Sequence, residues 1–194
     1  GKKADAQRGY EIACKEWMDV RSFGQVFAFK GSDLSLGIRG PVSVQPAFSV
    51  DPIDITSMQI TKSVNSEDKE GKSSDTMGMK HRVDFGIYVL KGSINVQLSE
   101  KTGFTEEDAE KIKEAIRTLF VNDSSSARPD GSMVMHKLYW WKHNCKIGQY
   151  SSHKVHNSIE IKKKEGVRNP RKIEDYEIIC HELPGLAVEE YEGL

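Results

Sequence analysis

The sequence is poor in the features that define several large classes of protein. Its three cysteines, Cys14, Cys145 and Cys180, include no Cys-x-x-Cys pair, which excludes a disulfide framework and predicts reduced thiols. Its apolar runs are short and broken by charge, and the opening "GKKADAQRGY" has no hydrophobic signal region. We therefore expect a cytoplasmic protein with no membrane partner.

Neither sign of charge is in excess. The 28 Lys and Arg residues nearly balance the 29 Asp and Glu residues, and the formal net charge is −1. Bulk charge therefore does not predict a nucleic-acid partner, and any anion-binding site must be a local cluster. The length of 194 residues suits a single domain that buries a substantial core.

The apolar pattern predicts strands before and after a long helix. Helical spacing marks residues 4–20, with a buried face that includes Trp17, and residues 105–119, where Thr105 is the expected N-cap. The buried stripe of the second helix is expected to be Ala109, Ile112, Ile116 and Leu119. Strands are predicted after Gly24, around Val42 and Val44, and over residues 54–64, 82–98, 135–144, 156–164 and 175–183, with Ile94, Val96 and Leu98 sharing one strand face. The absence of repeated strand and helix units indicates an α+β domain with a mainly antiparallel sheet.

A basic run interrupts this pattern at "TMGMKHRVDFGIYV", residues 76–89. Residues 65–76 before it carry no large apolar side chain, and the stretch "TMGMKH" is typical of a flexible, cationic neck. Gly78 permits close approach to the backbone, and Lys80, His81 and Arg82 supply cations, so this neck has the chemistry to hold phosphates. The alternative interpretation is an ordinary solvated loop.

Paired carboxylates are the nearest approach to a catalytic motif. Asp51 and Asp54 flank Pro52 and have the residue type for acid and base chemistry, but capping of the turn at Pro52 explains them as well. The sequence contains no Gly-x-Ser-x-Gly elbow, P-loop or dinucleotide fingerprint. We expect no catalytic residue and no enzyme activity.

Histidines and cysteines raise a metal hypothesis. His143 and Cys145 are spaced to share a strand face, and His153 and His156 lie close in sequence. Structural zinc sites show paired ligands at tight, repeated intervals, which this chain lacks, so we expect no metal site and no cofactor.

Neighbouring aromatic residues allow two interpretations. Trp140 and Trp141, beside Tyr139 on a predicted strand, have the residue type that stacks unpaired bases on sheet surfaces. Packing in the core is the alternative.

Extended, ordered segments resemble one known family. These segments are "DVRSFGQVFAF", "GIRGPVSV", "SVDPIDITSMQITKSVN", "SSDTMGMKHRVDFGIYV", "GSINVQLSEKTGFTEEDAEKIKEAI" and "HNCKIGQYSSHKVH". Over residues 16–156 they closely resemble the backbone subunit of the type I-C CRISPR Cascade complex, a Csd-type member of the repeat-associated protein superfamily.

The resemblance implies a fold and a set of partners. We expect a palm like an RNA-recognition motif (ferredoxin-like) over residues 1–194, with an inserted β-hairpin thumb over residues 53–79. The first palm strand of the family is expected to be absent from this sequence. The implied function is binding of CRISPR guide RNA, polymerisation along it, and periodic kinking so that it pairs with target DNA. The implied partners are guide RNA, target DNA through the guide, further copies of the chain arranged head to tail, and other Cascade subunits.

The resemblance also implies the RNA-binding residues. They are Arg21, Arg39, Gln45, Ser49, Thr76, Met77, Gly78, Lys80, His81 and Arg82. Two other functions remain as alternatives: a CRISPR-associated endoribonuclease, because relatives process RNA, and a purely structural assembly subunit whose basic neck contacts protein.

Overall fold

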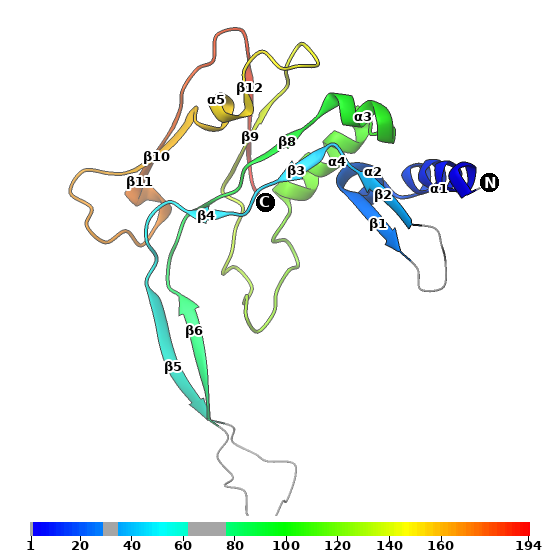
Figure 1. Ribbon diagram of the computed structural model, residues 1–194. Coiled ribbons are helices and arrows are strands. Elements are labelled where there is room, and N and C mark those ends of the chain that lie inside the picture. Colours follow the sequence, from blue (N-terminus) through cyan, green and yellow to red (C-terminus); the bar gives the residue numbers. More distant parts are fainter. Residues whose placement is uncertain (1, 29–34, 62–76) are drawn as a thin grey trace, which may run out of the picture. The chain divides into compact units, whose positions relative to one another are not determined.

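A computed structural model describes residues 2–28, 35–61 and 77–194. It confirms the predicted α+β class, with strands that pair in short antiparallel sheets (Figure 1). The chain divides into two compact units. The first unit comprises residues 1–45, 91–159 and 180–194, and the second comprises residues 46–90 and 160–179.

The helices and strands have the following bounds. The helices are α1 (Lys2–Glu16), α2 (Met18–Phe23), α3 (Val96–Thr102), α4 (Glu106–Arg117), α5 (Ser152–His156) and the 3-10 helix η1 (Ile173–Asp175). The strands are β1 (Gly24–Ala28), β2 (Ser35–Arg39), β3 (Val42–Val44), β4 (Phe48–Ser49), β5 (Ile55–Thr61), β6 (Met77–Val83), β7 (Tyr88–Val89), β8 (Gly92–Ile94), β9 (Lys137–Trp141), β10 (Ile159–Lys163), β11 (Tyr176–Cys180) and β12 (Val188–Glu192). In the described ranges β1 pairs with β2, β3 with β8, β4 with β7, β5 with β6, β9 with β12, and β10 with β11.

The N-terminal part of the first unit packs two helices against the β1–β2 hairpin. Cys14 of α1, Val20 of α2 and Ile38 of β2 are buried together in one apolar cluster. Gly24 joins α2 to β1 with a φ of +85°, and a Cβ there would lie 2.2 Å from the carbonyl oxygen of Ile38. Only glycine permits this turn, so it fixes how β1 leaves the helix.

The single helix predicted over residues 4–20 is in fact two helices. Trp17 separates them with extended backbone angles, and its side chain is 51% exposed rather than buried. Its ring lies 6.3 Å from that of Phe27, centroid to centroid. The break gives α2 a different direction from α1, so that Val20 and Ser22 become the buried residues of α2.

The strand predicted through Leu98 is correct only as far as Ile94. Asn95 accepts a hydrogen bond from the backbone N–H of Leu98 and begins α3, and Gly103 ends this helix in the left-handed region. Because a polar N-cap and a glycine C-cap fit a short helix, they outweigh the alternation of Val96 and Leu98.

Helix α4 follows the prediction closely. Thr105 accepts a hydrogen bond from the N–H of Asp108, whose carboxylate accepts one from the N–H of Thr105, forming a capping box. Ile112 is buried as predicted, but Leu119 lies beyond the helix end and is exposed. Lys113 is buried although it is charged.

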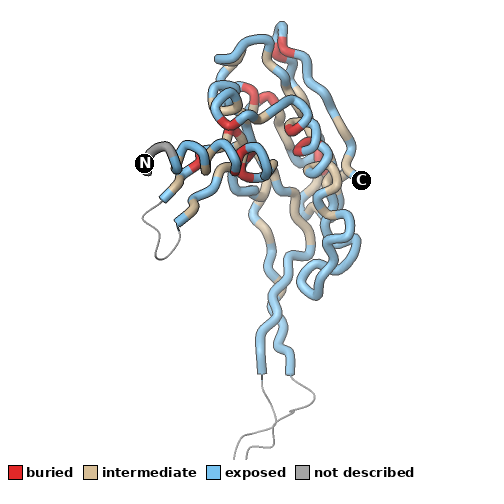
Figure 2. Tube along the Cα trace, turned by 90° about the vertical axis from the view of Figure 1, so that its right-hand side faces the viewer, coloured by how far each residue is buried: buried red, intermediate tan, exposed pale blue. Residues whose placement is uncertain are grey.

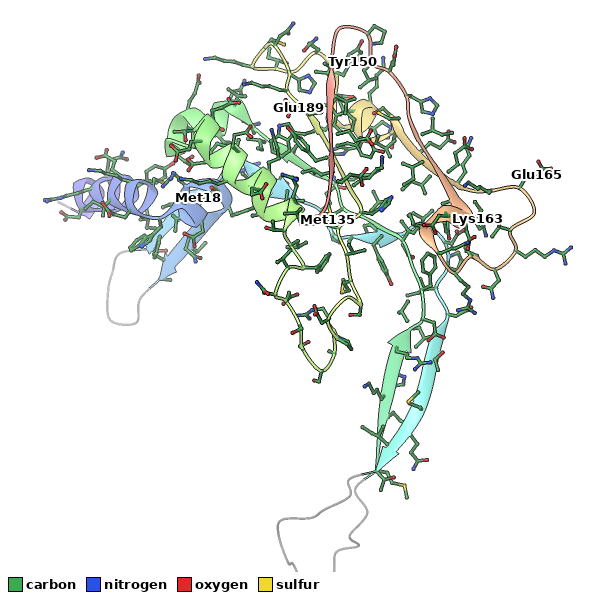
Figure 3. The ribbon with its side chains drawn as sticks, turned by 180° about the vertical axis from the view of Figure 1, so that it is seen from behind. Met18, Met135, Tyr150, Lys163, Glu165 and Glu189 are labelled. Atoms are coloured by element: carbon green, nitrogen blue, oxygen red, sulfur yellow. The ribbon has the colours of Figure 1, made fainter. Side chains whose placement is uncertain are left out.

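Lys113 joins α4 to the sheet of β9 and β12. Its ammonium donates to Glu110 at 2.8 Å and to Glu189 at 2.9 Å, and it lies about 5 Å above the rings of Trp140 and Tyr191. Figure 3 labels Glu189 on β12. Strand β12, which carries two of these partners, was not predicted from the sequence. The buried charge of Lys113 is therefore compensated by carboxylates and aromatic rings of the same unit.

The described residues of the second unit form three pairs of strands. Strands β10 and β11 were both predicted, and Tyr176 of β11 is buried. The β5–β6 hairpin is different, because apart from half-buried Thr56 the described residues of both strands are exposed (Figure 2). The hairpin therefore has no apolar core of its own.

Candidate nucleic-acid interface

The register of the β5–β6 hairpin decides which side chains share a face. Lys80 lies opposite Met58, and Arg82 lies opposite Thr56, so both cations point to the same side. Gly78 lies on that side as well, opposite Ile60. We call this side the cationic face; it consists of Thr56, Met58, Ile60, Gly78, Lys80 and Arg82.

A small polar network fixes one end of the cationic face. Asp84 accepts hydrogen bonds from the hydroxyl of Thr56 and from Nε of Arg82, both at 2.8 Å. These two bonds, that of Thr56 first, hold the pKa of Asp84 below its ordinary value. The charge of Arg82 is therefore partly neutralised and its guanidinium is held in place.

Lys80 is the second cation of this face. Its ammonium makes no hydrogen bond or ion pair with any residue that the structure describes, and its side chain is exposed. Two residues away, Gly78 leaves the backbone bare, and an added Cβ would meet only Ile60, at 3.6 Å. Packing does not require this glycine. An ammonium without a partner in the described chain, beside backbone that no side chain covers, matches the groups that bind nucleic-acid phosphates.

The opposite side of the hairpin combines four apolar side chains with four polar ones. Met77, Met79, Ile55 and Val83 are all exposed there, Met77 at 63%. Met77 is also held from the other strand, because the amide of Gln59 donates to its sulfur at 2.7 Å. We call this side the methionine face. Polarizable thioethers make favourable contacts with aromatic rings, which include nucleobases.

His81 belongs to the methionine face rather than to the cationic face. Its Nδ1 shares a hydrogen bond of 2.8 Å with the hydroxyl of Ser57 on β5. The alternation of the strand therefore separates the basic run: Lys80 and Arg82 point one way and His81 the other.

The expected flexible neck is a regular strand. From Met77 onward the segment pairs residue by residue with β5, up to Val83 opposite Ile55. The sequence prediction was wrong here because two methionines, a glycine and a basic run suggest a loop, whereas β5 supplies a partner for each residue. Thr76 and the polar stretch before it lie outside the described residues.

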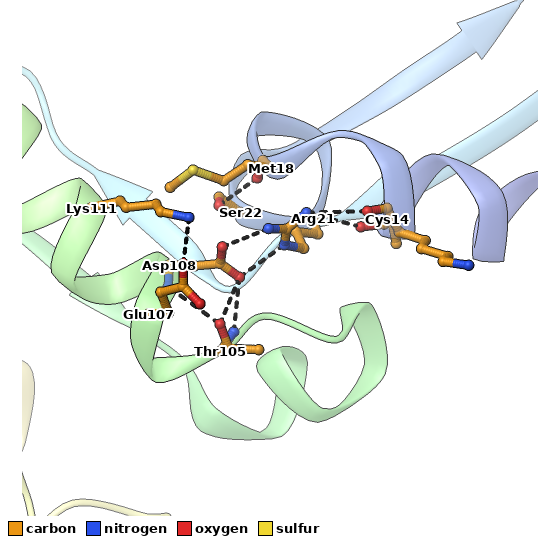
Figure 4. A network of polar contacts seen from close by, with 9 residues as sticks. Cys14, Met18, Arg21, Ser22, Thr105, Glu107, Asp108 and Lys111 are labelled. Atoms are coloured by element: carbon orange, nitrogen blue, oxygen red, sulfur yellow. Dashed lines mark hydrogen bonds and ion pairs between the residues drawn. The ribbon is translucent and has the colours of Figure 1, made fainter.

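Arg21 is held in a network at the junction of α2 and α4 (Figure 4). Its Nε and terminal nitrogen donate to the two carboxylate oxygens of Asp108 at 2.8 and 2.6 Å. Asp108 is almost completely buried, and the hydrogen bond from Arg21, with those from Thr105, lowers its pKa to about 2. This guanidinium has a strong structural role.

The other candidate RNA-binding residues are spread over both units. Arg39 is exposed at the end of β2, and the N–H of Gln45 donates to the carbonyl oxygen of Lys91. Ser49 is half-buried on β4. Of the candidates that the structure describes, Met77, Gly78, Lys80, His81 and Arg82 lie together on β6; the RNA-binding role of each candidate stays a prediction.

Sequence reasoning missed a cavity in the second unit. Its volume is about 260 Å³, and it lies where the hairpin strands end, against the loop between β10 and β11. The lining residues are Asp51, Pro52, Ile53, Asp54, Asp84, Phe85, Gly86, Ile87, Lys163, Arg168, Asn169, Pro170, Arg171 and Tyr176. They come from three separate stretches of sequence, so no motif could have revealed the cavity.

The two candidate carboxylates, Asp51 and Asp54, both line this cavity but differ in their hydrogen-bond and ion-pair partners. Asp51 accepts a hydrogen bond of 2.7 Å from the hydroxyl of Tyr176 and pairs with Lys163 at 3.3 Å, which lowers its pKa. Burial and the bond to Asp51 raise the pKa of Tyr176 to about 12. Asp54 makes no hydrogen bond or ion pair within the described ranges. Asp51 and Asp54 therefore do not form the paired acid and base that their sequence positions suggested as one interpretation.

The expected strand face of His143 and Cys145 does not exist, because β9 ends at Trp141. His143 accepts a hydrogen bond from the backbone N–H of Gln149. Among the residues that the structure places, no group of three or more His, Cys, Asp or Glu side chains is arranged to hold a metal ion.

The aromatic residues of β9 are engaged inside the fold. All five residues of the strand are half-buried, and the rings of Tyr139 and Trp141 stack at 6.1 Å between centroids. Trp140 lies beneath Lys113. These contacts favour core packing over base stacking.

One family model matches the chain. Described as CRISPR-associated protein Cas7, it covers residues 1–181. No curated protein sequence matches the chain. Within the described part of the chain, no helix has both the length and the apolar character needed to cross a membrane.

Proposed function

The chain belongs to the Cas7 family of CRISPR-associated proteins, a family of RNA-binding backbone subunits of surveillance complexes, and on this premise we propose that it is the guide-RNA backbone subunit of a type I-C complex. In this role the chain binds guide RNA through its backbone, polymerises head to tail along it, and kinks it at intervals. Target DNA then pairs with the exposed bases. The type I-C assignment rests on the sequence segments that resemble that subunit.

The observation that carries this proposal is the two-sided hairpin. Its cationic face presents the ammonium of Lys80, which has no partner among the residues that the structure places, beside the backbone of Gly78, which no side chain covers. Its methionine face presents Met77 and Met79. A strand pair that offers phosphate-binding groups on one side and apolar side chains on the other suits insertion between two nucleotides, with the backbone held on one side and a base displaced on the other.

Near-neutral charge supports polymerisation. With a formal net charge of −1, neighbouring copies experience little mutual repulsion. A head-to-tail contact uses two different surfaces of each copy and does not close on itself, so assembly continues for as long as the RNA does. The length of the RNA then sets the number of copies.

Binding and assembly can be tested on the purified full chain. We expect affinity for labelled single-stranded RNA of mixed sequence to fall steeply with salt, because phosphate contacts release counterions. Absorbance at 260 and 280 nm and light scattering should show particles whose mass increases with RNA length. Monomeric mass on saturating long RNA would overturn the backbone role, and affinity independent of salt would overturn phosphate binding.

The same preparation separates binding from cleavage. We propose that the chain binds guide RNA without hydrolysing it, and this is supported by Asp51, whose carboxylate is occupied by Tyr176 and Lys163. Labelled guide should remain intact on a denaturing gel after long incubation with and without Mg²⁺. Cleavage that copurifies with the protein, and disappears in an Asp54→Asn variant, would instead favour an endoribonuclease.

A further inference from the structure

The loop that joins β10 to β11 concentrates positive charge in a chain whose net charge is −1. Residues 162–172 include six basic side chains and one acidic side chain, that of Glu165. Figure 3 labels Lys163, with which β10 ends, and Glu165 in the loop. In a nearly neutral chain, a local cluster of this kind is required for binding a polyanion.

Hydrogen bonds close this loop at its base. The backbone N–H of Lys164 donates to the carbonyl oxygen of Asp175 at 2.9 Å. The carboxylate of Asp175 accepts from the backbone N–H groups of Arg171 and Lys172 at 2.7 and 3.2 Å, and these bonds hold its pKa below its ordinary value. The backbone of the loop is therefore held in place, while the guanidinium of Arg171 takes no part in holding it.

Two guanidinium groups of the loop line the cavity at the root of the β5–β6 hairpin. They belong to Arg168 and Arg171, and Asn169 lines the cavity with them. Both arginines are exposed, and neither guanidinium has a hydrogen bond or ion pair with any residue that the structure describes. The cavity volume is about 260 Å³, whereas a water molecule occupies about 30 Å³ in the liquid, so a phosphate group has room there.

The carboxylates of the cavity do not cancel these two charges. Asp51 is paired with Lys163 at 3.3 Å, and Asp84 with Arg82 at 2.8 Å. Asp54 is the third carboxylate of the lining and has no partner in the described chain. The charges left over are two guanidinium groups and one carboxylate, which is an excess of positive charge. This excess favours an anion, and repulsion from Asp54 reduces the attraction without reversing it.

The chemistry of the two arginines and their position select the anion. A guanidinium group donates to two phosphate oxygens at once, and this contact does not depend on the base that the phosphate carries. The cavity begins at Asp84, two residues after Arg82 of the cationic face. A nucleic-acid strand that follows the cationic face from Lys80 towards the root of the hairpin therefore arrives at this cavity.

We propose that Arg168 and Arg171 bind a phosphodiester of the guide RNA at the root of the hairpin, as a second phosphate site beside Lys80. The inference rests on the proposed function, which places guide RNA on the hairpin, and extends it to a loop about 90 residues further along the chain. Contacts to phosphates carry no base information, so this site holds RNA of any sequence.

Binding of labelled RNA to the full chain tests the site, with oligouridine and an oligomer of mixed sequence as the probes. Arg168→Gln and Arg171→Gln should each weaken binding of both RNAs about tenfold, as expected for a lost hydrogen bond to a charged group. Each should also reduce the slope of log affinity against log salt by about one. Asp54→Asn should tighten binding of both RNAs, because it removes a repulsive charge; weaker binding in this variant would overturn the inference.

A matched control removes the same charge from another part of the chain. Arg8 of α1 is exposed and lies in the first unit. Arg8→Gln should change the salt slope much less than either arginine variant of the loop. Equal reductions in Arg8→Gln, Arg168→Gln and Arg171→Gln would indicate a general effect of net charge and would overturn the site. The thermal midpoints of the loop variants should equal that of the wild type, which excludes misfolding as the cause of weaker binding.

The outcomes also separate this inference from the proposed function. Weaker RNA binding in Lys80→Ala, with wild-type binding in Arg168→Gln and Arg171→Gln, would overturn the loop site alone. Wild-type binding of short RNA by the loop variants, with smaller particles on long RNA, would assign the loop to contacts between copies and would likewise overturn the site. Failure of the wild type to bind either RNA would overturn the proposed function, and the loop site with it.

Discussion

The ion pair of Arg21 and Asp108 allows a quantitative prediction about a residue that the sequence nominated for RNA binding. Replacing Asp108 with Asn keeps the size of the side chain but removes the charge that two nitrogens of Arg21 contact. The pKa of Asp108 falls from its ordinary 3.8 to about 2 in the folded protein. At about 1.36 kcal/mol per pKa unit, the charged form adds about 2 kcal/mol to the free energy of unfolding at neutral pH.

This contribution depends on pH in a defined direction. Because the pKa is lower in the folded state, the stabilisation is complete above the unfolded pKa, near 4, and is lost as pH falls towards about 2. The stability difference between the wild type and Asp108→Asn should therefore be about 2 kcal/mol at pH 7 and much smaller near pH 2. Urea unfolding of both proteins, followed by circular dichroism across this range, measures the difference.

A second ion pair in the chain is a matched control. Arg128 and Asp123 also make two contacts, at 3.0 and 3.1 Å, but both side chains are 44% exposed. Asp123→Asn should leave stability nearly unchanged, because water screens exposed pairs. Equal loss of stability in Asp108→Asn and Asp123→Asn, or a loss in Asp108→Asn that does not shrink at low pH, would refute this reasoning.

Further predictions concern the hairpin and RNA binding. Lys80→Ala should weaken binding of all RNA sequences and reduce the slope of log affinity against log salt by about one. Asp84→Asn should do the opposite, because it releases the charge of Arg82; equal slopes in the wild type and both variants would contradict this. Gly78→Ala should leave the thermal midpoint unchanged, since the added methyl meets only Ile60 at 3.6 Å, yet lower RNA affinity; unchanged affinity would mean that RNA does not approach this backbone. Amide hydrogen exchange in β5 and β6 should slow when RNA is bound, and unaltered exchange at saturation would show that the hairpin lies away from the RNA.

Patterns local in sequence predicted local structure well. Thr105 and the acidic residues after it predicted α4 because cap and helix dipole act within one turn. Strands β10 and β11 were also predicted correctly, although burial does not alternate regularly from residue to residue in either strand. Short elements were not predictable in this way: α3 is set by Asn95 and Gly103 against the alternation of its apolar residues.

Charged residues were the main source of error. Periodicity assigns charged side chains to solvent, yet Asp108 and Lys113 are buried on α4. Their partners, Arg21 and Glu189, lie 87 and 76 residues away in sequence, so no local pattern identifies them. The cavity was missed for the same reason, because Asp54, Phe85 and Arg168 meet only in the folded second unit.

The contrast between these charges and those of the hairpin bears on function. In the first unit the buried charges have partners, so their hydrogen bonds stabilise the fold. On the hairpin, Lys80 has no partner in the described chain and Met77 is largely exposed. A two-stranded hairpin without an apolar core is marginally stable alone, and these exposed side chains bury little surface that would improve that stability. Their chemistry is therefore better explained by an external ligand than by folding, and a ligand with alternating phosphates and bases provides a partner for each face of the hairpin.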